Sequence, residues 1–132
     1  MIDLDHFKSV NDKFGHATGD QVLKEVAHRI GKLLRAVDIL TRYGGDEIAV
    51  ILPDTNKEFA MIVAERIRME ICSEPVLSGE ESIKTSVSIG VAAVPSPMIE
   101  SPEDLFRIAD QALYRAKKAG RNRVMAAKEK KK

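Results

Sequence analysis

Two glycines, Gly44 and Gly45, stand between two runs of strand-forming residues, and two carboxylates follow them directly. The first run covers residues 38–42 and the second covers residues 47–52. A glycine pair between such runs predicts an antiparallel hairpin, because tight hairpin turns need positive φ angles that glycine adopts at little cost. Glycine also has no side chain, so a ligand can approach the backbone of the turn closely. The chain is therefore expected to contain a β-sheet with an accessible turn at one end.

Acidic side chains gather around this turn. Asp46 and Glu47 are adjacent, and adjacent carboxylates repel each other, so a cation or a reacting hydroxyl is the natural reason for them. Asp3 lies in a short predicted strand at residues 2–4, and it faces the turn if that strand lies beside the hairpin. Converging oxygen ligands with room for phosphates predict a Mg²⁺ site of the phosphoryl-transfer kind. Exposed turn acids without a ligand are the alternative.

The composition argues against several other classes of protein. The 132 residues suit one domain, and a net charge of +1 gives no electrostatic reason to expect nucleic acid as a partner. The single cysteine, Cys72, excludes an internal disulfide and a cysteine-rich zinc site, and its apolar stretch predicts a buried thiol. No apolar run approaches the ~20 residues of a membrane span, and the N-terminus lacks the pattern of a signal peptide. We therefore expect a cytoplasmic protein without membrane contact.

Apolar spacing predicts helices between the strands. Gly19 and Asp20 open a long helix after a short one near the N-terminus. Thr55 predicts the N-cap of the third helix, with Glu58 completing a capping box, and Ser101 predicts the N-cap of the fourth. The third helix is expected to run to about Ser73 and to bury Phe59, Val63, Ile67 and Ile71.

The remaining segments predict a loop, two strands and a tail. Residues 74–82 predict a loop, residues 84–94 a central strand and residues 122–125 a last strand. The lysine-rich residues 128–132 predict a disordered tail. The order β-α-α-β-β-α-β-α-β predicts an α/β (α+β) fold, with a central, mostly antiparallel sheet flanked by helices.

Basic and amide side chains add candidates for binding a nucleotide. Lys8 lies in the first helix, and Lys117 and Arg121 end the last one, where cations can bind phosphate oxygens. Solvated helix ends are the alternative for each. Asn11 and Asp20 together can recognise a guanine edge, although capping of the long helix is an alternative for Asp20.

An ordered set of short motifs covers nearly the whole chain. The motifs are Asp3-Leu4-Asp5-His6-Phe7-Lys8, Asn11-Asp12, Gly15-His16, Gly19-Asp20, Arg35-Ala36-Val37-Asp38, Arg42 through Ile48, Ala64 through Arg68, Ser86 through Ala92, Ala109 through Tyr114 and Lys117 through Asn122. With these motifs in this order, the chain resembles the GGDEF domain of bacterial diguanylate cyclases; the name motif alone is short, but the ordered set is highly specific. The resemblance implies a GGDEF domain over residues 1–127 and a fold similar to nucleotidyl cyclases and polymerase palm domains.

The resemblance also implies a reaction, the condensation of two GTP molecules into cyclic di-GMP with release of two pyrophosphates. It implies Mg²⁺, with Mn²⁺ as an alternative cation. It implies a homodimer, because one site holds one GTP and two chains must face each other. Carried over by position, the metal ligands are Asp3, the Leu4 carbonyl, Asp46 and Glu47; the catalytic residues are Asp46, Glu47 and Lys8; the substrate-binding residues are Phe7, Asn11, His16, Asp20, Gly44, Gly45, Lys117 and Arg121.

A second nucleotide site is implied by three further residues. Arg35 and Asp38 match the family's product-inhibition motif, and Arg66 matches a second arginine of that site. Arginines can stack on guanine and fork onto phosphate, while the carboxylate pairs with a guanine edge. A surface Arg–Asp pair at a helix end is the alternative.

The chain departs from the family pattern in a few places. Ile48 replaces the usual Phe, and Asp46 stands in place of Glu, which is a common variant. The family's N-terminal helix, normally found before the Asp3 motif, is not in this chain. We therefore expect an exposed apolar patch, a frayed first strand, and an upstream sensory or receiver domain in a longer parent. A catalytically silent module that senses cyclic di-GMP or GTP, and a nonfunctional fragment, are the alternatives to an active cyclase.

Overall fold

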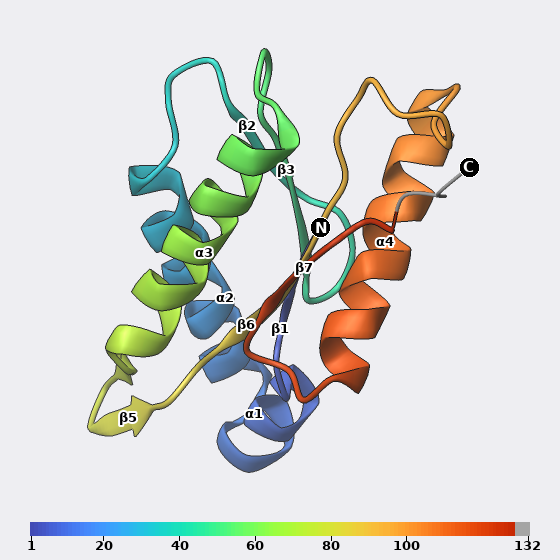
Figure 1. Cartoon of the computed structure of the whole chain (residues 1–132). Helices are drawn as coiled ribbons and strands as arrows, with labels where there is room; N and C mark the ends of the chain where they lie inside the picture. The colour runs from blue at the N-terminus through green and yellow to red at the C-terminus, as the bar shows by residue number, and fades with distance from the viewer. Residues whose placement is uncertain (129–132) are drawn as a thin grey trace.

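The computed structural model describes residues 1–128 and shows a five-stranded sheet between helices (Figure 1). The strand order is β2-β3-β1-β6-β7, in which β7 runs parallel to β6 and the other neighbours are antiparallel. The predicted fold class is thereby confirmed. The strands are β1 (Ile2–Leu4), β2 (Ile39–Arg42), β3 (Glu47–Ile51), β4 (Val76–Ser78), β5 (Glu81–Ile83), β6 (Val87–Val91) and β7 (Val124–Ala126); the helices are α1 (Phe7–Phe14), α2 (His16–Lys32), α3 (Lys57–Ser73) and α4 (Pro102–Lys118).

Strand β1 lies at the centre of the sheet and is paired on both sides, so the expected fraying is not seen. Ile2 lies opposite Ile48 of β3, and Asp3 lies opposite Glu47. Directly opposed residues of an antiparallel pair point to the same face. Ile2 and Ile48 therefore join the core under α2 and α3, whereas Asp3 and Glu47 share the other face, which carries α4.

Helix α4 packs directly on β6 because Gly90 has no side chain. A Cβ added at Gly90 would collide with backbone atoms of α4, namely the Ala109 carbonyl and the Leu113 nitrogen. Close approach of helix and strand at this point sets the height of α4 above the sheet. Lys117, one turn beyond Leu113, is thereby brought down to the face that carries Asp3.

Two helix starts differ from the prediction. Helix α2 begins at His16 with Gly15 as N-cap, so Gly19 and Asp20 lie inside the helix and the capping role considered for Asp20 is wrong. The N-cap of α3 is Asn56, whose side chain accepts from the Phe59 N–H at 2.9 Å. Since Asn56 already satisfies this donor, the capping box predicted at Thr55 is wrong. The predicted cap at Ser101 is confirmed, because its hydroxyl accepts from the Asp104 N–H at 3.1 Å.

Residues 74–82 do not form a simple loop but contribute to a small hairpin of β4 and β5. Arg29 explains the start of this hairpin, because its guanidinium donates to the Glu74 and Pro75 carbonyls at 2.7 and 3.0 Å. The central strand is shorter than predicted, since β6 covers Val87–Val91 rather than residues 84–94.

Two side chains predicted to be buried are exposed. Phe59 is 62% exposed, because the buried face of α3 passes through Ala60 and Ala64 instead. Cys72 is also exposed. An apolar cavity of about 530 Å³ is lined by residues of α3, of α4, of β3 and of the segment after β6, including Ile51, Val63, Val94 and Phe106.

No helix of residues 1–128 is both long and apolar enough to cross a membrane. The lysine-rich tail predicted at residues 128–132 lies outside the described residues, except for Lys128.

Candidate functional site

The glycine turn between β2 and β3 is wider than predicted. The N–H groups of Tyr43 and Gly44 donate to the Glu47 carbonyl at 2.9 and 3.4 Å. The Arg42 guanidinium reaches over the turn and donates to the carbonyls of Gly44 and Gly45 at 3.3 and 2.7 Å. Neither glycine has a positive φ, so the predicted conformational reason for this pair is wrong. Nothing lies within 4 Å of a Cβ built at Gly45, which leaves the backbone of the turn open to a ligand.

Asp3 is the buried acid of the site, with 4% of its surface exposed. Lys117 forms an ion pair with its Oδ2 atom, and its Oδ1 atom has no hydrogen-bond partner. Burial raises the pKa of Asp3 to about 7; the Lys117 ammonium opposes this rise and the nearby Asp46 carboxylate adds to it. Asp3 and Asp46 therefore lie close enough to repel each other. A buried, unpaired carboxylate oxygen beside a second carboxylate is a natural ligand for a cation.

Lys117 brings the last helix into the site. Burial alone would lower its pKa, but the hydrogen bond and charge of Asp3, with the charges of Asp46 and Glu47, raise it. The ammonium therefore stays charged at neutral pH among three carboxylates. The structure thus brings together one predicted phosphate binder and the three predicted acids.

The acids fit a divalent cation that shares its coordination with a substrate. No three His, Cys, Asp or Glu side chains of residues 1–128 converge into a metal-binding cluster. Asp3 and Asp46 supply two carboxylates, and the Leu4 backbone lies beside them, its N–H donating to the Asp46 carbonyl at 3.3 Å. Mg²⁺ commonly takes one or two carboxylates, several waters and substrate phosphates. The donor set therefore suits an ion that arrives with phosphates.

The two residues predicted to recognise guanine, Asn11 and Asp20, lie in different surroundings. The amide oxygen of Asn11 on α1 is buried without a hydrogen-bond partner and packs against Gly19 of α2, with the Phe7 ring nearby. A Cβ at Gly19 would overlap that oxygen. Asp20 is exposed at the rim of a cavity of about 270 Å³, whose lining also includes Leu23, Leu40, Arg42 and Ile48.

Three predicted substrate contacts are exposed and unpaired. Lys8 lies on α1 and His16 begins α2. Arg121 lies in the turn after α4 with a left-handed φ of 62°. No hydrogen bond or ion pair within the described part of the chain engages these side chains. They are free to contact a ligand, and the geometry does not bring them to Asp3.

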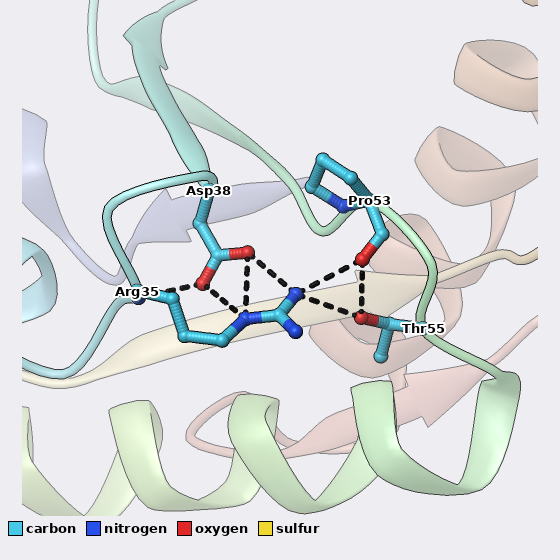
Figure 2. Close-up of polar contacts among 4 residues, drawn as sticks. All are labelled: Arg35, Asp38, Pro53 and Thr55. Atoms are coloured by element: carbon cyan, nitrogen blue, oxygen red, sulfur yellow. Dashed lines mark hydrogen bonds and ion pairs between the residues drawn. The ribbon is translucent and has the colours of Figure 1, made fainter.

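Figure 2 shows the predicted product-inhibition residue Arg35 bound by protein groups. Its Nη2 atom donates to Asp38 Oδ1 at 2.8 Å, and to the Pro53 carbonyl and Thr55 Oγ1 at 3.0 Å each. The Asp38 side chain is 3% exposed, and the hydrogen bond from Arg35 lowers its pKa. Arg66 is exposed on α3, and no bond within residues 1–128 joins it to this pair. Arg35 and Asp38 have the geometry of the alternative interpretation, an Arg–Asp pair near a helix end. The role of these residues in binding product stays a prediction.

Two contacts near the site were not predicted. Tyr43 of the turn stacks on Phe106 of α4, with ring centroids 5.6 Å apart and planes at 12°. Asp5 accepts hydrogen bonds from the hydroxyls of Ser86 and Ser88 at 2.7 and 2.6 Å. The alternation of two serines on one face of a predicted strand was the available signal for the second contact.

Known proteins resemble this chain over nearly its whole length. A family model described as "Diguanylate cyclase, GGDEF domain" matches residues 1–123. The chain belongs to the GGDEF family. The response regulator PleD of Caulobacter vibrioides is 46% identical over 127 residues, which are 95% of this chain and 28% of PleD.

Solved GGDEF domains also have the same fold. That of PA1120 (YfiN or TpbB) from Pseudomonas aeruginosa is 38% identical with a TM-score of 0.92, and the match covers 98% of this chain and 80% of that one. That of DgcB from Caulobacter crescentus, in complex with c-di-GMP, is 37% identical with a TM-score of 0.84, covering 95% and 74%. This chain spans about a quarter of PleD, so it corresponds to one part of a longer relative.

Proposed function

We propose that this GGDEF chain is one half of a diguanylate cyclase, which condenses two GTP molecules into cyclic di-GMP and two pyrophosphates. The observation that carries the proposal is the pairing of Asp3 opposite Glu47 and beside Asp46, with Lys117 reaching them from α4. Asp3 and Asp46 can supply two carboxylates to a metal, and Lys117 can supply a positive charge to phosphates beside it. The name of the matching family model supports the same reaction.

The reaction needs a nucleophile, a metal and a held triphosphate. Mg²⁺, for which Mn²⁺ can substitute, would be held by Asp3, Asp46 and the Leu4 carbonyl, and it would neutralise charge on the phosphates. Glu47 would accept the proton of a GTP 3′-hydroxyl. The 3′-oxygen then bonds to the α-phosphorus of the other GTP, the bond from that phosphorus to the bridging oxygen breaks, and pyrophosphate leaves.

Basic residues hold the phosphates in this proposal. Lys117 would exchange its bond to Asp3 for phosphate oxygens once the metal neutralises the carboxylate. Lys8 and Arg121 are exposed and unpaired, so they can turn toward the triphosphate at little cost. Gly44 and Gly45 leave their backbone open to the ribose and phosphates.

Guanine would be recognised by Asn11 and Asp20, with Phe7 and His16 completing the pocket. Asp20 lines a cavity of about 270 Å³ together with apolar side chains such as Leu23 and Leu40 and with Arg42, whereas Asn11 lies outside that lining and would meet the base from α1. An amide and a carboxylate can pair with the guanine edge but not with adenine in the same way.

We expect Gly19→Ala to weaken GTP binding about tenfold, the value of one lost hydrogen bond to a buried group. The new Cβ would displace the Asn11 amide, whose tip can move without disturbing the backbone. The free energy of unfolding should change by less than about 1 kcal/mol, because alanine favours a helix interior. Calorimetry with GTP in the presence of Ca²⁺ would measure the GTP affinity, and urea unfolding would measure the free energy of unfolding. Gly31→Ala, in the same helix with nothing within 4 Å, should leave GTP binding unchanged; an equal loss there would refute this role of Asn11.

One site holds one GTP, so two chains must face each other for a bond to form between two nucleotides. In a longer parent, an upstream sensory or receiver domain would set how often the two chains meet. We place this activity in the cytoplasm, where GTP is available.

The rate of pyrophosphate release tests the proposal. With GTP and Mg²⁺, the rate should rise with the square of chain concentration below the dimerisation constant, and ATP should not replace GTP. A rate proportional to chain concentration would contradict the facing-chain mechanism. GTP binding without any release would favour the alternative, a catalytically silent module that senses GTP or cyclic di-GMP.

Product inhibition is a separate part of the proposal. Arg35, Asp38 and Arg66 would bind cyclic di-GMP, and the structure of the related DgcB domain is described as a complex with c-di-GMP. Ligand binding at this site would require Arg35 to give up part of its network with Asp38, Pro53 and Thr55.

We expect Arg35→Ala to weaken binding of cyclic di-GMP at this second site strongly. The guanidinium is the group that can fork onto phosphate or stack on guanine, and alanine can do neither. Calorimetry should show micromolar or tighter binding to the wild-type chain and a loss of about 100-fold in the variant. Arg107→Gln, which removes another exposed arginine paired with an acid, is the matched control. Unchanged binding in Arg35→Ala would remove the site from this account.

A further inference from the structure

The turn after α4 has an unfavourable backbone conformation at Arg121. Arg121 and Asn122 have φ angles of 62° and 45°, and they follow Gly120 with a φ of 126°. Left-handed backbone is unfavourable for residues with a Cβ, and consecutive residues adopt it only where their surroundings hold them there. Something in the fold must therefore hold this turn in place.

Asn122 is held from two sides. Its N–H donates to Asp5 Oδ2 at 3.0 Å, and its side-chain oxygen accepts from Arg68 Nη1 at 3.0 Å. Arg68 lies on α3 and is also paired with Glu65. The turn is thereby tied both to the segment that follows β1 and to α3, which come from distant parts of the chain.

Both oxygens of the Asp5 carboxylate accept hydrogen bonds within the fold. Its carboxylate accepts from the hydroxyls of Ser86 and Ser88 and from the Asn122 N–H, and its own N–H donates to the Ser86 carbonyl at 3.0 Å. Hydrogen bonds to a carboxylate are short and strong. Both carboxylate oxygens of Asp5 are therefore hydrogen-bonded within the fold, unlike Oδ1 of Asp3 two residues earlier.

We propose that Asp5, Ser86, Ser88, Arg68 and Asn122, the Asp5 bracket, position Arg121 to bind nucleotide phosphates. The Arg121 side chain has no partner in the described residues, so the backbone of its turn decides where the guanidinium can reach. Asp5 connects that turn to the same strand end that carries Asp3. The bracket thus fixes the position of the backbone at Arg121 relative to the strand end that carries Asp3. The phosphate-binding role of Arg121 rests on the proposed function, whereas the contacts of the bracket are those of the structure.

Binding of inorganic pyrophosphate tests the bracket independently of catalysis. Asp5→Asn removes the negative charge that accepts from the Asn122 N–H. Arg68→Gln removes the guanidinium on α3 that donates to the Asn122 side-chain oxygen. Each variant should weaken pyrophosphate binding about tenfold, the value of a misplaced charged hydrogen bond. Arg121→Gln should show a loss of the same size, and Arg107→Gln, on the exposed face of α4, should show none.

Two further readouts separate positioning from general damage. The amide proton signal of Asn122 in the nuclear magnetic resonance spectrum should move in Asp5→Asn, because the N–H loses a charged acceptor. Binding of guanosine should be unchanged in all variants, because it lacks phosphate. Equal losses for guanosine and pyrophosphate would show a structural role and overturn the proposal.

The remaining outcomes are also decisive. Pyrophosphate binding that is absent in the wild-type chain, or unchanged in both Asp5→Asn and Arg68→Gln, would overturn the bracket. A chain that needs Asp5 to bind pyrophosphate but forms no cyclic di-GMP would refute the proposed function and leave the bracket standing. Cyclase activity with pyrophosphate binding unaffected by the variants would refute the bracket alone.

Discussion

Asp46→Asn is expected to lower the rate of cyclic di-GMP formation about 1000-fold, within the range for loss of a group that acts at the reacting atoms. The change keeps the shape of the side chain and removes one of the two carboxylates that would hold the cation. The backbone bond from the Leu4 N–H to the Asp46 carbonyl at 3.3 Å is unaffected. Chromatographic measurement of product from GTP and Mg²⁺ would give the rate.

The same variant should not be less stable than the wild-type chain. The Asp46 carboxylate raises the pKa of buried Asp3, which means that the two groups repel when both are ionised. Removing that repulsion should leave the free energy of unfolding equal or slightly higher. Glu80→Gln, an exposed carboxylate in the turn between β4 and β5, should change neither rate nor stability. A rate in Asp46→Asn within tenfold of wild type would exclude this residue as a metal ligand.

Gly90→Ala is expected to be the most destabilising small substitution, by roughly 3 kcal/mol, at the upper end of the range for overpacking. The added methyl group would collide with the backbone of α4 at Ala109 and Leu113 rather than with a side chain that can turn away. The helix would have to rise from β6, and its C-terminal end carries Lys117. Product formation should therefore fall as well, even where the protein remains folded.

Gly31→Ala is the matched control for Gly90→Ala. Gly31 lies near the end of α2 with nothing within 4 Å of a Cβ position, so alanine should raise the free energy of unfolding by up to about 1 kcal/mol through helix propensity. Urea unfolding of both variants should therefore give effects of opposite sign. A Gly90→Ala chain as stable as wild type would show that α4 does not lie as closely on β6 as the structure has it.

Local patterns in the sequence were enough to predict the sheet and its central acids. Two apolar runs with glycines between them gave β2 and β3, and the expected approach of Asp3 to the turn agrees with its register opposite Glu47. These features depend on residues that are close in sequence or on strand alternation. The family, and with it the fold, followed from motif order.

Features that depend on distant partners could not be predicted. Asp5 contacts Ser86, Ser88 and Asn122, which lie 81, 83 and 117 residues away. The alternation of the two serines indicates a polar strand face, but the residues around Asp5 do not identify it as the partner of that face. The glycine turn takes its shape from the Arg42 side chain rather than from positive φ angles.

Helix and strand ends were also missed where a competing group decides them. Asn56 rather than Thr55 caps α3 because its side chain reaches the free N–H of Phe59. Arg29 binds the carbonyls of Glu74 and Pro75 and so supports a hairpin where the composition of residues 74–82 predicted a loop. Both depend on side-chain geometry that composition does not contain.

The identity of the product formed from GTP decides whether this chain is half of a GTP-condensing enzyme. Purified chain, incubated with GTP and Mg²⁺ at concentrations where it dimerises, should yield a compound that co-elutes with cyclic di-GMP and has its mass, together with two pyrophosphates per molecule. Phosphate and GDP as the products, or GTP that stays intact while bound, would contradict the account of this site as half of a GTP-condensing enzyme.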